Sequence, residues 1–198
     1  MPRIVDRTAR RSELAAAAAG IFAERGVANT AVSDIVKAAG VAQGTFYLYF
    51  ESKDDVVLAV VDGIAQQLIA QIRAAVDAAG STAVEKFLAL RDVFIAADID
   101  ASTVELADFM HRRENRPLHD RMAEQFVPAL IPLMESIVSQ GVAEGAFRVR
   151  DTHAAAWFVL GGLQSAELSG TPAERMPAAI TAATGFALRA LGYTGAGS

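Results

Sequence analysis

The sequence predicts an all-α protein. Apolar residues recur at the three- and four-residue spacing of helices that bury one face, as at Leu14, Ala18, Ile21 and Phe22. Serine or threonine followed three residues later by a carboxylate is typical of helix starts, and glycines follow several helical stretches. The alternating patterns of strands are nearly absent. We expect about nine helices, with three short helices at the N-terminus and a larger helical body after them.

Most predicted helices have a recognisable start or stop. In chain order they span residues 14–25, 32–39, 43–50, 53–79, 83–97, 103–111, 117–140, 152–168 and 172–191. The glycines that end the first, second and fourth are Gly26, Gly40 and Gly80. Capping boxes predict the starts of the fourth, fifth and ninth helices at Ser52, Thr82 and Thr171, and Asp151 is the expected cap of the eighth.

Prolines complicate two of these helices. Pro128 and Pro132 lie inside the seventh, where each removes a backbone N–H donor at a general cost of ~3 kcal/mol or more. The pattern predicts either a break or a bend held by packing, and such a bend either lines a cavity or simply follows the core. Pro177 predicts a bend or a restart of the last helix.

Composition narrows the class of protein. The 198 residues are 53% hydrophobic and contain no cysteine, which excludes disulfides, thiolate metal sites and a cysteine nucleophile. The longest apolar run, residues 154–163, is shorter than the ~20 residues that span a bilayer. The first residues lack the apolar stretch of a signal peptide. We expect a soluble cytoplasmic protein.

Charge is distributed unevenly along the chain. Residues 1–53 contain seven basic and five acidic side chains, whereas the other residues contain eleven basic and eighteen acidic ones. A slightly basic N-terminal part on an acidic body favours contact with a polyanion through that part alone. The alternative is that the asymmetry is an accident of composition.

Residues 30–50 have the plan of a helix-turn-helix, two short helices joined by a tight turn that contains glycine. Ile35 and Val41 are expected to pack inside the corner, and Phe46 and Phe50 to face the core. The second helix carries no charge between Gln43 and Phe50, so any base recognition uses amide, hydroxyl and phenol groups.

Each polar group of this segment has a role that fits DNA. Gln43 has the groups to pair with adenine, Thr45 can meet a base or a thymine methyl, and Gly44 permits close backbone approach. Tyr47 and Tyr49 either reach phosphates or cover the core with a polar tip. Lys53 meets a phosphate or is solvated, and four arginines precede the motif as further backbone or minor-groove contacts: Arg3, Arg7, Arg10 and Arg11.

The first sixty residues resemble the tetracycline-repressor (TetR) family of bacterial transcriptional regulators. The resemblance rests on Phe22-Ala23-Glu24-Arg25-Gly26, Asp34-Ile35, Ala38-Ala39-Gly40-Val41, Gly44-Thr45-Phe46-Tyr47, Tyr49-Phe50 and Ser52-Lys53. It implies a DNA-binding domain at residues 1–52 and an effector-binding and dimerisation domain at residues 53–198. The DNA contacts that it implies are Thr30, Gln43, Gly44, Thr45, Tyr47, Tyr49 and Lys53.

Two alanines depart from the family pattern. Ala31 and Ala42 stand where the family usually has a serine or threonine that caps a helix of the motif. Alanine cannot cap, and the loss is ~1 kcal/mol in general. We expect Thr30 to replace the first cap.

The last two predicted helices are rich in small residues and apolar over much of their circumference, so they need burial on several sides. A symmetric partner accounts for this pattern, and the resemblance implies a four-helix dimer interface here. An alanine-rich intramolecular core is the alternative. The expected interface residues are Ala155, Phe158, Gly162, Ser165, Ala179, Ala183 and Phe186.

The middle of the chain has the apolar and aromatic character of a ligand cavity with few polar groups. Its expected ligand residues are Gln67, Gln71, Phe94, Phe109, Met110, His111, Gln125, Phe126 and Trp157. His111, His119 and Asp120 do not match the spacing of a metal site. We expect no metal and no cofactor.

Together these features predict a homodimeric repressor that binds a palindromic operator and is released by a small, mostly apolar effector. The alternative is a helical ligand-binding protein without sequence-specific DNA binding. An enzyme is not expected, because no nucleophile with a base, phosphate loop or metal cluster is recognisable.

Overall fold

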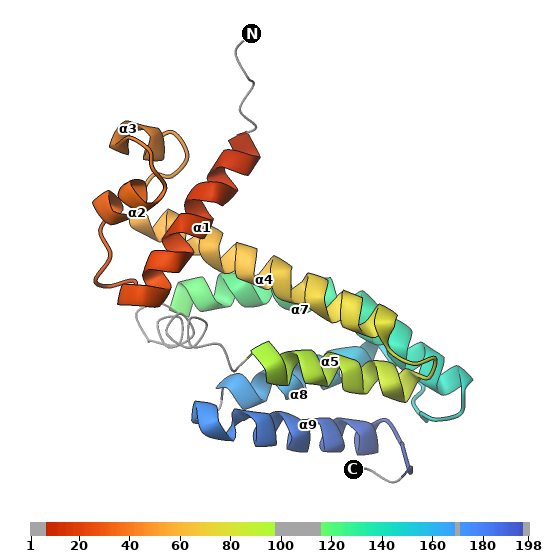
Figure 1. Cartoon of the computed structure of the whole chain (residues 1–198). Helices are drawn as coiled ribbons and strands as arrows, with labels where there is room; N and C mark the ends of the chain where they lie inside the picture. Colours follow the sequence, from red (N-terminus) through yellow and green to blue (C-terminus); the bar gives the residue numbers. More distant parts are fainter. Residues whose placement is uncertain (1–6, 98–115, 169–170, 196–198) are drawn as a thin grey trace. The chain divides into compact units, whose positions relative to one another are not determined.

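The computed structural model describes residues 7–97, 116–168 and 171–195, and it is all-helical there, as predicted (Figure 1). Its elements are α1 (Arg7–Arg25), α2 (Val32–Ala38), α3 (Gln43–Phe46), α4 (Lys53–Ala78), α5 (Ala83–Ala97), α7 (Arg116–Ala143), α8 (Thr152–Leu168), the 3₁₀ turn η2 (Ala173–Arg175) and α9 (Met176–Ala190). The helix predicted at residues 103–111 lies outside the described residues.

The chain divides into two compact units. The first unit comprises residues 1–67 and 100–123, and the second unit comprises residues 68–99 and 124–198. The division falls inside α4, whose first half packs with α1, α2 and α3. Each unit has its own hydrophobic core.

The core of the first unit gathers buried residues from all four of its N-terminal helices: Leu14, Ala18, Phe22, Ile35, Val36, Phe46, Phe50, Val56, Val57 and Val60. The rings of Phe46 and Phe50 lie 5.5 Å apart between centroids, and both are fully buried. The predictions that these rings face the core and that Ile35 and Val41 pack in the corner are confirmed, with Val41 partly buried.

α3 is shorter than the helix predicted at residues 43–50. α3 ends at Phe46, and the chain continues in tight turns in which the N–H of Leu48 donates to Thr45 and that of Tyr49 to Phe46. Gly44 and the aromatic residues that follow are weak helix formers, and Ala42 provides no side-chain cap. The weak helix propensity accounts for the early end, because Phe46 and Phe50, four residues apart, would share one face of a continuous helix as well.

Glycine ends the first two helices as predicted. Gly26 and Gly40 have φ angles of 75° and 64°, which lie in the left-handed region that favours glycine. Each thus turns the chain directly out of a helix. Gly26 begins the loop between α1 and α2, and Gly40 lies in the turn of the helix-turn-helix between α2 and α3.

The long helix α4 is a core helix. Among the described helices it alone is long and apolar enough to cross a membrane by length and composition. Its buried residues belong to protein cores, with Val56 and Val60 in the first unit and Ile72 and Val76 in the second. At its start the N–H of Asp55 donates to Ser52 Oγ, whereas the Asp55 carboxylate accepts from Glu51 rather than completing the expected capping box.

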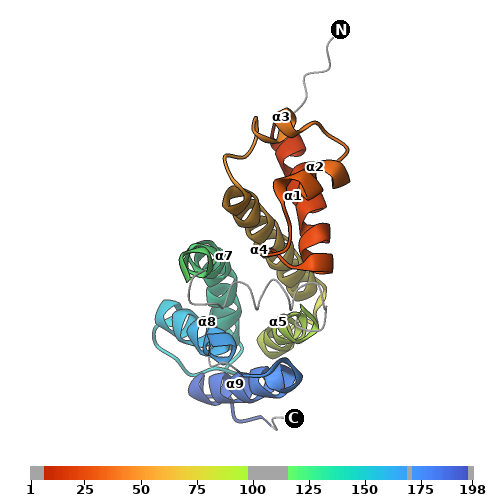
Figure 2. The same ribbon diagram turned by 90° about the vertical axis from the view of Figure 1, so that its left-hand side faces the viewer.

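In the second unit α8 and α9 pack side by side, and α5 lies against α9 (Figure 2). The core contains large buried residues from every helix of this unit: Ile72, Phe87, Leu90, Leu130, Met134, Ile137, Phe147, Val159, Ile180 and Leu191. The capping box of Thr82 and Glu85 forms, and Asp151 Oδ1 accepts the N–H of Ala154. Both predicted starts are confirmed.

Proline has different effects in α7 and α9. α7 is one continuous helix with Pro128 and Pro132 inside it, so the expected alternative of a break is wrong. Both prolines are exposed. The last helix does not begin at residue 172, because a 3₁₀ turn occupies residues 173–175 and α9 restarts at Met176 with Pro177 in its first turn.

Candidate nucleic-acid interface

α3 turns an uncharged polar surface outward. Gln43 and Gly44 are exposed and Thr45 is half-buried, whereas Phe46 is fully buried behind them. The space beside Gly44 is open, since a Cβ built there meets no atom within 4 Å. The short helix is therefore free to present its amide, hydroxyl and backbone groups to a ligand outside the protein.

The two tyrosines after α3 differ in their surroundings. Tyr47 is 55% exposed and meets the buried Phe46 ring edge-on at 5.3 Å between centroids. Tyr49 is half-buried and packs against the core of the first unit. The exposure of Tyr47 leaves its phenol available, whereas Tyr49 also covers the core.

Capping of α2 differs from the expectation. Ala31 is its N-cap residue and makes no side-chain cap, but the Asp34 carboxylate accepts the N–H of Ala31 at 2.9 Å. Thr30 is only 2% exposed, and its hydroxyl donates to the carbonyl of Gly26 at 2.8 Å. The expectation that Thr30 replaces the cap is wrong, because its hydroxyl is bonded to the end of α1.

Two arginines of α1 bond to other segments of the first unit. Arg7 donates to the carbonyl of Leu48 at 3.2 Å, and Arg11 pairs with Asp55 at 2.9 Å while its guanidinium lies 4.6 Å from the Phe50 ring centroid. These contacts attach the first half of α1 to the turn after α3 and to the first turn of α4.

Lys53 also bonds within the first unit. Its Nζ donates to the carbonyls of Val27 at 2.9 Å and Thr30 at 3.2 Å. The ammonium that was predicted to contact a phosphate thus bonds to two backbone carbonyls in the protein without DNA.

The second unit has an exposed apolar face on α8 and α9. Phe158 is 65% exposed and Phe186 is 68% exposed, which is unusual for phenylalanine. Gly162 and Ser165, four and seven residues after Phe158 on α8, are also exposed. The other three expected interface residues, Ala155, Ala179 and Ala183, are half-buried and pack against the core.

The expected ligand residues do not gather into one described site. Phe94 packs against the core of the second unit, Gln67 and Gln71 are exposed on α4, and Trp157 is exposed on α8. Phe109, Met110 and His111 lie outside the described residues. Gln125 and Phe126 belong to α7, in a stretch whose side chains are also outside the description.

A polar network that the sequence did not reveal joins α5 to the end of α7. Lys86 Nζ donates to Gln140 Oε1 at 2.9 Å, and the N–H of Ala83 donates to Glu144 Oε2 at 3.0 Å. The Ala83 bond, aided by the Gln140 side chain, holds the pKa of Glu144 below its ordinary value. The four-residue spacing of Gln140 and Glu144 was the only available signal.

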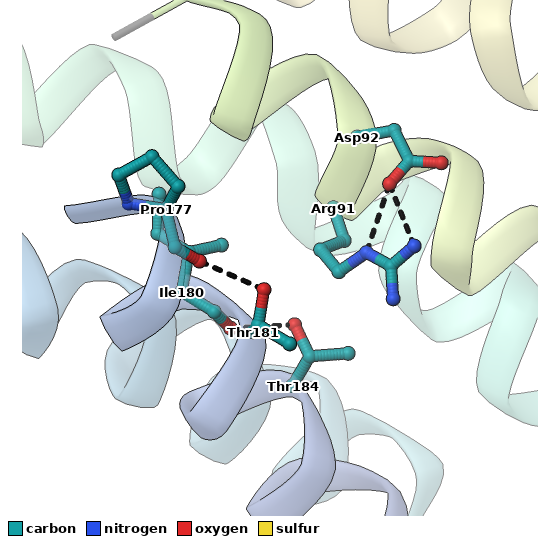
Figure 3. Close-up of polar contacts among 6 residues, drawn as sticks. All are labelled: Arg91, Asp92, Pro177, Ile180, Thr181 and Thr184. Atoms are coloured by element: carbon teal, nitrogen blue, oxygen red, sulfur yellow. Dashed lines mark hydrogen bonds and ion pairs between the residues drawn. The ribbon is translucent and has the colours of Figure 1, made fainter. Parts of the chain in front are cut away.

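Polar side chains of α5 and α9 are also bonded locally (Figure 3). Arg91 donates to Asp92 Oδ1 through Nε at 2.9 Å and Nη2 at 2.7 Å. Thr181 and Thr184 donate to carbonyls four residues earlier in α9. Within the described residues no group of three His, Asp or Glu side chains is arranged to hold a metal ion.

Comparison with known proteins gives consistent matches. Residues 14–60 match the family model of bacterial regulatory proteins, tetR family. The transcriptional repressor KstR2 of Mycobacterium tuberculosis is 30% identical over 183 residues, covering 81% of this chain and 87% of the relative.

Two solved structures show the same fold. A TetR-family transcriptional regulator from Pectobacterium atrosepticum superposes with a TM-score of 0.73 at 22% identity, over 96% of this chain and 97% of the other. The transcriptional regulator FadR of Bacillus subtilis, solved in complex with stearoyl-CoA, gives a TM-score of 0.65 at 23% identity, over 90% and 96%.

Proposed function

This chain belongs to the TetR family of bacterial regulatory proteins, and from that premise we propose how it regulates transcription. It is a DNA-binding transcriptional regulator. We propose a homodimeric repressor that binds a palindromic operator and leaves it when a small, mostly apolar effector binds. The outward, uncharged surface of α3 over the buried Phe46 is the observation that supports this proposal most strongly.

In this proposal residues 1–52 form the DNA-binding domain and residues 53–198 the effector-binding and dimerisation domain. Gln43, Gly44 and Thr45 read base edges in the major groove, since amide and hydroxyl groups both donate and accept there. Tyr47 and Tyr49 donate phenol O–H groups to phosphates. We leave Thr30 out of this set because its buried hydroxyl is already bonded to Gly26.

The proposed dimer uses α8 and α9 of each subunit. An isologous interface places the same residues of both copies around a two-fold axis, so each contact occurs twice and the exposed rings of both copies are covered. Phe158 and Phe186 supply the apolar area, and the small residues Gly162 and Ser165 allow close approach of the helices. Two recognition helices related in this way bind half-sites ~34–36 Å apart.

The proposed effector is largely apolar. FadR of Bacillus subtilis, which has the same fold, binds stearoyl-CoA, a ligand with a long apolar chain. An effector acts only through a preference for the arrangement that does not bind DNA, and near-complete release needs a preference of about 10⁴. The effector contacts expected from the sequence stay a prediction, because those residues do not gather into one site within the described residues. We also propose that the chain acts by binding, without turnover, in the cytoplasm.

A mobility-shift assay on the DNA upstream of its own gene tests the proposal. Tyr47→Phe and Tyr49→Phe each remove one phenol O–H from each subunit and are expected to weaken binding about 10²-fold, since a hydrogen bond to a charged group contributes about 1.5 kcal/mol and two are lost per dimer. Tyr193→Phe is the matched control, because Tyr193 packs against Phe147 in the second unit.

Three outcomes separate the hypotheses. Loss in both recognition-segment variants, with Tyr193→Phe unchanged, supports the assigned contacts. Undiminished binding by both variants refutes the phosphate contacts. If wild-type protein shifts no upstream DNA and none selected from random duplexes, the ligand-binding protein without DNA recognition becomes the better account.

A further inference from the structure

Lys53 is held by the protein at the place where a phosphate contact was expected. Its side chain is half-buried, and its ammonium donates to two carbonyls, those of Val27 and Thr30. We propose that Lys53 is a positioning residue that sets the geometry of the DNA-reading helices, rather than a phosphate contact. This inference rests on the proposed function.

The electrostatics of α4 favour this arrangement. Lys53 is the first residue of α4, where the helix dipole disfavours a cation. Two carbonyl oxygens supply the negative potential that compensates the ammonium without any DNA. Hydrogen bonds from a charged donor are stronger than neutral ones, so these two bonds stabilise the position of Lys53 in the protein without DNA.

The two carbonyls belong to the loop that leads into α2. Gly26 turns the chain out of α1, and α2 begins at Val32 after this loop. The carbonyl of Val27 also accepts the N–H of Thr30 at 3.3 Å, so one tight turn carries both partners of Lys53. The bond therefore fixes the entry to α2 against the first residue of α4.

Arg7 fixes the other end of the same segment. It donates to the carbonyl of Leu48, in the turn that leaves α3. Lys53 at the entry and Arg7 at the exit thus anchor the α2–α3 segment on both sides. Loss of the Lys53 anchor should leave the hydrophobic core in place while loosening the approach of α3 to a base edge.

Salt dependence distinguishes positioning from phosphate contact. Each neutralised phosphate contributes about 0.9 to the slope of log affinity against log salt concentration, so a phosphate contact in both subunits contributes about 1.8. A positioning residue contributes to affinity without contributing to this slope.

The test uses the full chain and a duplex that the wild-type protein selects from a random library, with a scrambled duplex of equal composition beside it. Affinity is measured from about 50 to 200 mM salt for wild type, Lys53→Met and Lys37→Met. Lys37 is exposed on α2, so its replacement removes one positive charge from the same unit and controls for charge alone.

We expect Lys53→Met to bind the selected duplex about tenfold more weakly than Lys37→Met does, with the wild-type slope and unchanged affinity for the scrambled duplex. Hydrogen exchange of residues 27–35 in the free variant should be faster than in wild type. Circular dichroism fixes a temperature at which every variant is folded, and Lys53→Arg, which keeps a charged donor, should recover most of the binding.

A slope lower by about 1.8 in Lys53→Met, with unchanged exchange in the free protein, overturns the inference and leaves the proposed function intact. Faster exchange with an unchanged ratio of selected to scrambled affinity also overturns it, because Lys53 then has a structural role only. Failure of wild type to select any duplex counts against the proposed function instead.

Discussion

Replacing Phe158 with alanine tests the proposed dimer. A phenylalanine side chain presents roughly 200 Å², and 65% of Phe158 is exposed in the single chain. Covering that area at ~25 cal/mol per Å² contributes ~3 kcal/mol for each copy, of which alanine retains about a third. Both copies change in a symmetric dimer, so the loss is ~4 kcal/mol and the dissociation constant rises about 10³-fold.

Sedimentation equilibrium of wild type, Phe158→Ala and Leu48→Ala measures this effect. Leu48 is a suitable control because it is 66% exposed but lies beside α3 in the first unit. We expect the control to dimerise as wild type does, and Phe158→Ala to be monomeric at low micromolar concentration with an unchanged circular dichroism spectrum. A dissociation constant within a few-fold of wild type refutes the assignment of this face.

Two further predictions concern hydrogen bonds of the second unit. The N–H of Ala83 holds the pKa of Glu144 below its ordinary value, so this carboxylate stabilises the fold above that value, and the stabilisation is lost as pH falls through the folded pKa. Urea unfolding at pH about 6, 4 and 3 should show a smaller acid loss in Glu144→Gln, and equal losses contradict the linkage. The indole N–H of Trp157 donates to Nε2 of His153 at 3.1 Å, while Nδ1 lies 2.9 Å from Glu135 Oε2. These bonds select the Nδ1–H tautomer, so His153→Ala, which removes the acceptor of the indole N–H, should shift the emission of this sole tryptophan; an unchanged emission spectrum contradicts the assignment.

Local signals predicted the ends of helices well. Gly26 and Gly40 end α1 and α2, and the box at Thr82 starts α5, because each depends on residues within one turn of chain. The length of α3 was overestimated because the four-residue spacing of Phe46 and Phe50 fits a helix, although Gly44 and the aromatic residues after it are weak helix formers.

Contacts between distant segments could not be predicted from the sequence. Lys53 meets carbonyls of the loop after α1, 23 and 26 residues away, and Lys86 meets Gln140 across 54 residues. No spacing rule relates such residues, so their partners are known only once the helices pack. The residues expected to contact an effector come from α4, α5, α7 and α8 and from residues outside the description, and no spacing rule relates them either.

Selection of duplexes from a random DNA library tests the central claim most directly. The account predicts that wild-type protein enriches an inverted repeat whose half-site centres lie ~34–36 Å apart, about one helical turn, with one dimer bound to each duplex. Enrichment of a single asymmetric site bound by a monomer, or of no sequence at all, contradicts it.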